Sequence, residues 1–354
     1  MRKKRILVAP INWGLGHATR CIPLIRQLEG NGFEPVLASD GPALFLLKKE
    51  FPHLRSYELP SYNITYTTKG SLLKWKLLRD TPSILSNIRK EIKVTRTIVE
   101  QENLSGIISD SRFGVRHKHV RSAFITHQLN VLSGNTTFLS SKLHRRYIRK
   151  FDQCWVPDAP GKNNLSGFLG HLKKSPAEEI KYLGILSRFQ KKNVPIIIYD
   201  RMILLSGPEP QRTLLEEKLL SAFNGTGEKI IFIRGVMTEE PFPVTNPNIK
   251  LHNYLFGEEL EDAINSSRMI ISRSGYTTLM DLAVLEKMAF FIPTPGQFEQ
   301  EYLANRLMKL GITPFCKQEE FDLSKLATTG KFSGLRDPGF SCDSPGLFGL
   351  FKGE

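Results

Sequence analysis

The sequence predicts an α/β protein built from two Rossmann-like domains in series. Strand-like apolar runs alternate with helix-like segments, which is the rhythm of a parallel sheet covered by helices. The alternation occurs in two blocks, and residues 159–195 between them are rich in the Gly, Pro and polar residues of loops. A chain of 354 residues also exceeds what one hydrophobic core usually supports, so we expect two domains.

Each block gives its expected elements in order. The first predicts strands at 5–9, 35–39, 106–109, 122–126 and 153–157, and helices at 17–30, 41–50 and 82–102. The second predicts strands at 202–206, 229–234, 249–255, 268–272 and 289–293, and helices at 209–223, 258–266, 276–287 and 299–310. We expect an N-terminal domain over 1–165, a linker region over 166–198 and a C-terminal domain over 199–330. The Gly-, Ser- and Pro-rich tail over 331–354 predicts poor order and no closing helix.

The charge of the chain is divided unevenly. The first 150 residues carry 26 Lys and Arg against 10 Asp and Glu, whereas the rest carries 23 against 25. This asymmetry indicates that the first half faces an anionic partner, which leaves phosphate-bearing substrates, acidic lipid and nucleic acid open. The four cysteines lack the CxxC spacing of metal sites, and no signal peptide or membrane-spanning run is evident. We therefore expect a cytoplasmic protein with free thiols.

The loops that follow the predicted strands hold the candidate site residues of the first domain. Ligands of such sheets bind outside the carboxyl ends of the strands, and two domains would face each other across a cleft there. The first loop, PINWGLGH (10–17), has Gly14 and Gly16 but lacks the third glycine of a dinucleotide fingerprint. His17 would lie at a helix N-terminus, where the helix dipole favours a neutral ring that can act as a base. The alternative is a tight turn without chemistry.

Two further loops of this domain carry polar residues. Asp110 and Arg112 in SDSRFG follow a predicted strand, and either an acceptor-binding or a structural role is open to them. His127 in THQL also follows a strand and is a reserve candidate for the base, with a buried core histidine as the alternative.

The second domain carries candidate residues for binding a diphosphate, a ribose and sugar hydroxyls. Ser206-Gly207 and Ser274-Gly275 each end a strand at the start of a helix, which is an arrangement that suits a diphosphate. Asp281, about two turns into its helix, could bind the two hydroxyls of a ribose. A polar cluster suits sugar hydroxyls, and its members are Gln297, Glu299, Gln300 and Glu301. Ordinary helix caps and solvated surface residues are the alternatives.

The segment SRSGYTTLMDLA…FFIPTPGQFEQEYLANRL resembles the donor-site signature of glycosyltransferase family 28, which has the GT-B fold. WGLGH resembles the acceptor-side loop of that family, and WGLGHATR is similar to the opening motif of related bacterial glycosyltransferase-like proteins. The resemblance covers about residues 5–30 and 200–312. It implies an inverting, metal-independent transfer of a hexose or N-acetylhexosamine from a nucleotide-diphosphate sugar, usually UDP-linked, without a cofactor.

The resemblance also implies residue roles. His17 matches the family's candidate base, and Asp281 falls where the family usually has a ribose-binding Glu. Gln300 and Glu301 fall on a Gln-Gln pair that binds the donor sugar. The loop and turn that bind the nucleotide diphosphate correspond to Ser206, Gly207, Arg273, Ser274 and Gly275. Two substitutions, Asp for Glu and Glu for Gln, separate this chain from the family pattern, and the first donor loop, SGPEPQR, lacks the family's second glycine.

Two basic segments bear on the partner. KGSLLKWKLLRD (69–80) and KLHRRYIRK (142–150) mix leucine or tyrosine with Lys and Arg, as interfacial segments for anionic membranes do. A solvated basic helix is the alternative. A lipid-linked acceptor, met by an enzyme peripheral to the inner face of a membrane, would explain both segments, although the acceptor is open.

Two other classes of function compete with the transferase. One is a UDP-sugar epimerase on the same fold, with Asp110 or Glu301 near the sugar. The other is a non-catalytic binder of anionic lipid or nucleic acid. The sequence shows no recognised nucleic-acid-binding motif, so no nucleic acid is expected.

Overall fold

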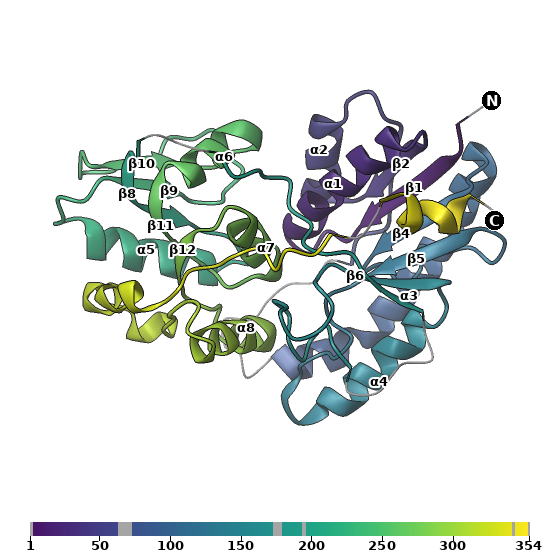
Figure 1. The fold of residues 1–354 in the computed structure, drawn as a ribbon. Helices are drawn as coiled ribbons and strands as arrows, with labels where there is room; N and C mark the ends of the chain where they lie inside the picture. The colour runs from purple at the N-terminus through teal and green to yellow at the C-terminus, as the bar shows by residue number, and fades with distance from the viewer. Residues whose placement is uncertain (1–2, 63–72, 173–178, 193–195, 342–343, 353–354) are drawn as a thin grey trace. The chain divides into compact units, whose positions relative to one another are not determined.

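The computed structural model describes residues 3–62, 73–172, 179–192, 196–341 and 344–352. The chain divides into two compact units (Figure 1). Of the described residues, unit 1 holds 3–62, 74–172 and 179–188 together with those from Pro338 onward, and unit 2 holds those within Phe189–Asp337. Each unit contains one parallel sheet with helices around it. The predicted α/β class with two Rossmann-like units is confirmed.

Unit 1 is built on a seven-stranded parallel sheet with the order β3-β2-β1-β4-β5-β6-β7. Apolar residues fill its central strands because both faces of a parallel sheet are covered. The strands are β1 (Arg5–Pro10), β2 (Glu34–Ser39), β3 (Ser56–Glu58), β4 (Gly106–Asp110), β5 (Arg121–Ile125), β6 (Gln153–Val156) and β7 (Ile180–Tyr182). The helices are α1 (Gly16–Gly30), α2 (Gly41–Glu50), α3 (Leu73–Glu102) and α4 (Thr137–Ile148), with a 3₁₀ turn, η2 (Gly134–Thr136). The order reverses between β1 and β4, which makes that point the switch point of the sheet.

Unit 2 repeats the plan with five parallel strands in the order β10-β9-β8-β11-β12. Its strands are β8 (Tyr199–Leu204), β9 (Ile230–Ile233), β10 (Ile249–His252), β11 (Ser267–Ser272) and β12 (Met288–Phe291). Its helices are α5 (Gln211–Phe223), α6 (Gly257–Asn265), α7 (Tyr276–Val284) and α8 (Phe298–Lys309), followed by the 3₁₀ segments η3 (Gln318–Glu320) and η4 (Leu323–Lys331). Its switch point lies between β8 and β11.

The region expected to be a linker over 166–198 belongs largely to unit 1. Asp158 is fully buried and accepts hydrogen bonds from the backbone N–H groups of Ala159, Leu165 and Ser166. These bonds fold the Gly- and Asn-rich stretch into a compact loop. The chain then adds β7 to the edge of the sheet beside β6. The turn composition of this stretch therefore reflects an ordered loop, and the boundary between the units falls at Arg188–Phe189.

The tail corrects the expectation of poor order over 331–354. Residues from Pro338 belong to unit 1, where α9 (Ser344–Leu347) and η5 (Phe348–Phe351) form. The Phe348 and Phe351 rings are buried, and both contact Trp155. A Cβ on Gly106 would lie 2.3 Å from the Phe351 ring, so glycine makes room for this ring on β4. A few apolar anchors in a short, glycine-rich segment are enough to dock it, although composition alone predicts otherwise.

Among the helices of the described residues, none combines the length and the apolar character needed to cross a membrane. Cys21, Cys154 and Cys316 are buried free thiols, as expected, and Cys342 lies outside the described residues.

Candidate active site

The glycine loop of unit 1 joins β1 to α1 and brings His17 to the start of that helix. Gly14 has φ +79°, a left-handed conformation that costs glycine little. Gly16 is the first residue of α1 and His17 is the second. The loop therefore places His17 in the first turn of α1, where backbone N–H groups have no partner within the helix.

His17 and Asp110 meet at the switch point of the unit 1 sheet. Asp110 ends β4, where it pairs in register with Pro10, the last residue of β1. The Nδ1 atom of His17 lies 2.8 Å from Asp110 Oδ1. The carboxyl ends of β1 and β4 are where ligands of this sheet type bind, so the pair occupies the expected position for chemistry.

Arg20 completes this cluster, and the sequence analysis missed it. Its guanidinium donates to both oxygens of Asp110, with Nε 2.5 Å from Oδ2. Arg20 and Asp110 are both buried. The available signal was the i, i+3 spacing from His17, which puts both side chains on one face of α1. That spacing does not show which helix face meets β4.

Burial and charge set the protonation states of this cluster. Arg20 and His17 hold the pKa of Asp110 well below its usual range despite the complete burial of the carboxyl, so Asp110 is ionised. Burial and the Arg20 charge lower the pKa of His17, and Asp110 only partly offsets them. A neutral imidazole beside an ionised carboxylate is an arrangement that can accept a proton.

The other two candidate residues of unit 1, His127 and Arg112, have different surroundings. His127 is buried just beyond β5, and its Nδ1 lies 3.1 Å from Arg20 Nη1, so it belongs to the same cluster. Arg112 points elsewhere. It is buried between Asp40 and Glu91, and its Nε donates to Pro10 O at 2.9 Å. These partners assign Arg112 to the support of the glycine loop, and an acceptor-binding role does not fit them.

The candidate donor loops of unit 2 lie at its switch point. Ser206 and Gly207 follow β8, and both are exposed. Gly207 has φ +111°, which a side chain would strain. Gly275 caps α7 in an extended conformation, while the Ser274 hydroxyl donates to Gln300 O at 2.8 Å. The N-terminus of α7 thus follows the end of β11, beside β8 in the sheet.

Arg273 is buried and holds this end of the sheet together. Its Nη1 donates to Ile292 O at 3.0 Å and to Pro293 O at 3.1 Å, and its Nη2 donates to Gln211 O and Gln318 Oε1, each at 2.7 Å. Burial lowers its pKa to about 10, so it stays charged at neutral pH. Both Nη groups are occupied by unit 2 itself, whereas Nε is buried without a hydrogen-bond partner among the described residues, so only Nε remains for the predicted contact with diphosphate.

The polar cluster at the start of α8 contains one buried residue, Gln300, and exposed or half-buried ones. Gln300 is buried, and its Oε1 accepts the Thr294 N–H at 2.9 Å. Glu301 is exposed and accepts the Gly296 N–H at 3.0 Å. Both side chains therefore shape the loop after β12. Asp281 is half-buried in the second turn of α7.

Besides Arg273 Nε, two polar atoms near these loops are buried without a hydrogen-bond partner among the described residues, Thr294 Oγ1 and Gln297 Oε1. A Cβ on Gly207 would lie 3.8 Å from Thr294 Oγ1, so the two loops are close neighbours. Buried polar atoms normally find partners, and an unpaired one calls for an explanation such as a bound ligand. Thr294 directly follows the predicted strand 289–293, and this position is the signal for it in the sequence.

Arg234 is a further residue that the sequence pattern does not single out, because it ends the predicted strand 229–234. It lies just after β9, and its Nε donates to Glu216 Oε1 at 2.9 Å. Its guanidinium also lies 4.0 Å from the centre of the Phe242 ring. These contacts hold the long loop after β9 to α5.

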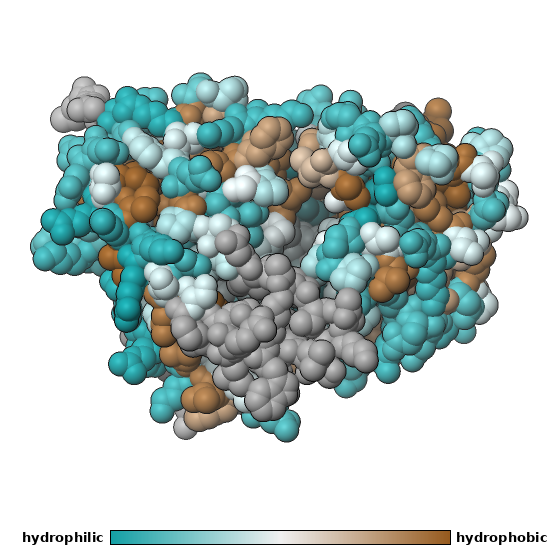
Figure 2. All heavy atoms as spheres, turned by 180° about the vertical axis from the view of Figure 1, so that it is seen from behind, coloured by the Kyte–Doolittle hydropathy of each residue, from teal (hydrophilic) through white to brown (hydrophobic). Residues whose placement is uncertain are grey.

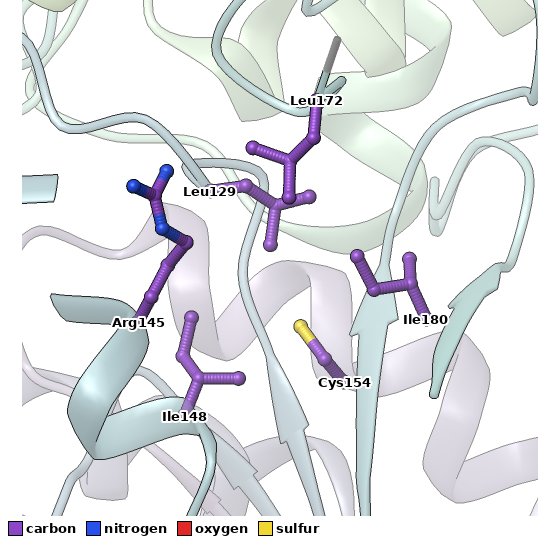
Figure 3. Close-up of a pocket in the computed structure, with 6 residues that line it drawn as sticks. All are labelled: Leu129, Arg145, Ile148, Cys154, Leu172 and Ile180. Carbon is purple, nitrogen blue, oxygen red and sulfur yellow. The ribbon is translucent and has the colours of Figure 1, made fainter. Parts of the chain in front are cut away.

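A small gap beneath α4 is no substrate site. Figure 3 shows Arg145 and the apolar side chains that line it, Leu129, Ile148, Leu172 and Ile180, with Cys154. Its volume of about 10 Å³ leaves room for about one water molecule. Across the described ranges, no three His, Cys, Asp or Glu side chains gather as a metal ion would require.

A comparison with protein-family models finds a match within unit 2. Residues 211–332 match the glycosyltransferase family 28 C-terminal domain. An uncharacterised glycosyltransferase of Methanopyrus kandleri is 23% identical over 319 residues, which cover 85% of this chain and 89% of the relative. A UDP-N-acetylglucosamine–N-acetylmuramyl-(pentapeptide) pyrophosphoryl-undecaprenol N-acetylglucosamine transferase of Methylobacterium radiotolerans is 32% identical over 74 residues, 20% of each chain.

Solved structures share the fold at low identity. The glycotransferase of kitacinnamycin has a TM-score of 0.64 at 13% identity and covers 99% of this chain and 95% of its own. The MurG protein of Acinetobacter baumannii has a TM-score of 0.56 at 14% identity and covers 100% of both chains. A putative UDP-N-acetylglucosamine 2-epimerase of Listeria monocytogenes has a TM-score of 0.62 at 11% identity, and the match covers 100% of this chain and 98% of the epimerase chain. The family match over residues 211–332 and the relatives confirm the resemblance to family 28 glycosyltransferases, and the solved structures confirm the GT-B fold.

Proposed function

We propose that the protein transfers a sugar from a UDP-linked donor to an acceptor hydroxyl with inversion, and that His17 is the base. The observation that carries this proposal is the 2.8 Å contact between His17 Nδ1 and Asp110, whose carboxylate is ionised. When the carboxylate accepts a hydrogen bond from Nδ1–H, the lone pair of the ring lies on Nε2, which can take the proton of an acceptor hydroxyl. The hydroxyl oxygen then attacks the anomeric carbon as the bond to the diphosphate breaks.

Unit 2 is proposed to bind the donor through backbone and small side chains. The N-terminus of α7 at Gly275 and the exposed loop at Ser206-Gly207 lie at its switch point, where N–H groups can bind the diphosphate. The unpartnered Thr294 Oγ1 and Gln297 Oε1 offer hydrogen-bonding atoms for sugar hydroxyls or phosphate. Asp281 is the proposed ribose ligand. Since helix N-termini stabilise the leaving diphosphate in this scheme, we propose that no metal is needed.

The test of the donor site is thermal stabilisation by UDP, GDP, dTDP, ADP and NAD. A ligand at 100 times its Kd adds about 2.7 kcal/mol to the free energy of unfolding. We expect UDP alone to stabilise the wild type, and to stabilise neither Asp281→Ala nor Thr294→Val. Glu217→Ala, an exposed change on α5 in the same unit, is the matched control and should respond as the wild type does. Equal responses of Asp281→Ala and the wild type would refute the ribose assignment.

A lipid-linked acceptor is supported by the exposed face of α4. Phe138, Leu139 and Leu143 are 77%, 67% and 54% exposed, and basic residues lie on the same helix, namely Lys142, Arg145 and Arg146. Figure 2 shows that hydrophilic side chains predominate on the face in view, with hydrophobic ones in small groups. Exposed apolar side chains next to basic side chains suit the interface of an anionic membrane. The other candidate segment, 69–80, lies outside the residues whose side chains are described.

Vesicle flotation tests this surface. We expect the wild type to bind vesicles that contain phosphatidylglycerol and not to bind neutral phosphatidylcholine vesicles. Phe138→Ser with Leu139→Ser should reduce binding about tenfold or more, because each buried aromatic or aliphatic side chain contributes roughly 1.5–3 kcal/mol. Phe45→Ser removes a comparably exposed ring on α2 and serves as the control. Equal binding by all these variants would place the membrane contact elsewhere or exclude it.

The epimerase is the second candidate, favoured by the likeness of the fold to the putative UDP-N-acetylglucosamine 2-epimerase. An epimerase converts UDP-sugar without an acceptor, whereas a transferase releases UDP in proportion to glycosylated acceptor. Incubation of the enzyme with UDP-N-acetylglucosamine alone separates them, since a new UDP-sugar in the absence of acceptor would support the epimerase.

A further inference from the structure

Arg112 lies at the centre of a buried polar network that joins several segments of unit 1. Its Nη1 donates to Glu91 Oε1 on α3 at 2.8 Å and to Pro60 O at 3.2 Å, and its Nη2 donates to Asp40 at the N-terminus of α2. Its Nε donates to Pro10 O at the end of β1. Each nitrogen of the guanidinium therefore has a partner, and every partner comes from a different segment.

The second carboxylate of this network, Glu91, has a full set of donors. Its Oε2 accepts from the Tyr62 hydroxyl at 2.6 Å and from the Gly114 N–H at 3.0 Å, while Oε1 accepts from Arg112. Glu91, Arg112 and Asp40 are all buried. Buried ion pairs add little net stability compared with apolar packing, whereas a fully satisfied polar network specifies a single geometry. The network is therefore better explained by the geometry that it fixes than by stability.

The network reaches the glycine loop at two points, Pro10 and Asn12. Pro10 O accepts from Arg112 Nε and also from the Ser39 hydroxyl at 2.8 Å. Asn12 Nδ2 donates to Asp40 Oδ2 at 3.2 Å, while Oδ1 of the same carboxylate accepts from Arg112. One contact holds the main chain of the loop and the other holds a side chain two residues further on.

Gly41, the first residue of α2, leaves room for the contact of Asn12 with Asp40. A Cβ on Gly41 would lie 2.6 Å from Asn12 Nδ2, which is closer than such atoms can approach. Gly41 also has φ +49°, a left-handed conformation that costs glycine little. A larger residue at this position would displace the Asn12 amide from Asp40.

Trp13 directly follows Asn12, and its side chain is 44% exposed. Trp13 stands four residues before His17, so the Cα atoms of the two residues lie within about 14 Å of each other. An exposed tryptophan on a loop that is already held supplies a large, rigid contact area at a low cost in conformational entropy. The loop therefore offers an aromatic surface near the proposed base.

We propose that Arg112 and Asp40 are positioning residues that hold the glycine loop in one conformation, with Trp13 in a fixed orientation on the acceptor side of unit 1. Asn12 connects Asp40 to the loop and is the last residue of the network. A contact of Trp13 with the acceptor rests on the proposed function, whereas the fixed conformation of the loop is a property of the chain alone.

Fluorine NMR of protein labelled with 5-fluorotryptophan tests the conformation of the loop without any ligand. The chain has three tryptophans, and Trp13→Phe and Trp155→Phe assign the two resonances that are compared. Asn12→Ala removes the last contact and leaves the ion pairs of Arg112 in place, so we expect this variant to fold. The single Trp13 resonance of the wild type should shift or split in Asn12→Ala, in Arg112→Met and in Gly41→Ala. The resonance of Trp155, which is fully buried, should stay in place.

Arg116→Met is the matched control, because Arg116 lies in the same loop as Arg112 and its Nε has no hydrogen-bond partner among the described residues. Its Trp13 resonance should coincide with that of the wild type. An unmoved Trp13 resonance in Asn12→Ala would overturn the proposal even if the protein proves to be a transferase, and so would an equal shift in Arg116→Met. A shift confined to Trp13 in Asn12→Ala would uphold it even if His17 proves not to be the base.

Discussion

The two units place their candidate sites at the same topological point but build them from different groups. In unit 1 the ends of β1 and β4 bring together charged side chains, with His17, Arg20 and Asp110 in direct contact. In unit 2 the ends of β8 and β11 present mainly backbone and small residues, because Arg273 and Gln300 are occupied by internal hydrogen bonds. A polar residue after a strand therefore has two uses, and its burial and partners decide which one applies.

The comparison predicts that the largest effect on activity comes from His17. His17→Ala removes the proposed base, and we expect kcat/KM to fall about 10² to 10⁴-fold with little change in the melting temperature. His53→Ala is the control, because that histidine is exposed and pairs with Glu29 at the surface. Retained activity in His17→Ala would place the chemistry outside the unit 1 cluster and remove the contrast between the units.

Arg273 tests the other side of the comparison. Arg273→Met leaves four buried acceptors without their donor, so we expect the free energy of unfolding to fall by about 3 kcal/mol. Chemical denaturation measures this loss, and Arg268→Met, an exposed change on the same strand, should be near neutral. If Arg273→Met kept its stability and lost only affinity for UDP, the arginine would be a donor ligand and unit 2 would resemble unit 1.

The sequence predicted the fold well because strands and helices are set by local periodicity. Every predicted strand and helix is present, most with shifted ends. The short edge strands β3 and β7 were not predicted, and α4 was foreseen only as the alternative of a solvated basic helix over 142–150. Strands of three residues carry too little pattern to detect. The docked tail was missed because its burial depends on a distant partner, the Phe351 ring against Gly106 and Trp155.

The candidate site was predictable only in part. Position after a strand end identified His17, Asp110 and the small residues of unit 2, because all strands of a parallel sheet end at one edge. The same rule also selected Arg112 and Arg273, whose direction depends on buried partners from remote elements. The same rule did not select Arg20, because this residue lies inside a helix and not after a strand. Its side chain contacts Asp110 from the face of α1 that packs against the sheet.

The concentration of buried titratable groups in unit 1 predicts an acid sensitivity. Burial lowers the pKa of His144 on α4 to about 4, with His127 and Arg145 adding to the effect. The unfolded chain binds this proton near pH 6.5 and the folded chain only near pH 4, so stability is lost as pH falls between these values. We expect about 2 kcal/mol of loss from this group by pH 5.

Thermal melts of wild type and His144→Gln between pH 7.5 and 5 measure this effect. The variant should lose less stability on acidification, although it starts less stable, and His53→Gln should follow the wild type. Parallel curves for wild type and His144→Gln would mean that acid acts on other groups, and the assignment of acid sensitivity to His144 would be withdrawn.

The smallest expected effect concerns donor choice in unit 2. Glu301→Gln restores the Gln-Gln pair of the family pattern at an exposed position. The Gln oxygen can still accept the Gly296 N–H, so the fold of the loop should be kept. Competition between UDP-N-acetylglucosamine and UDP-glucose measures the result as a ratio of kcat/KM values. We expect this ratio to change a few-fold, about 1 kcal/mol, since one oxygen–amide exchange alters one hydrogen bond. An unchanged ratio would mean that Glu301 serves only the loop, as Gln300 does, and that donor choice in unit 2 depends on its backbone and on Thr294.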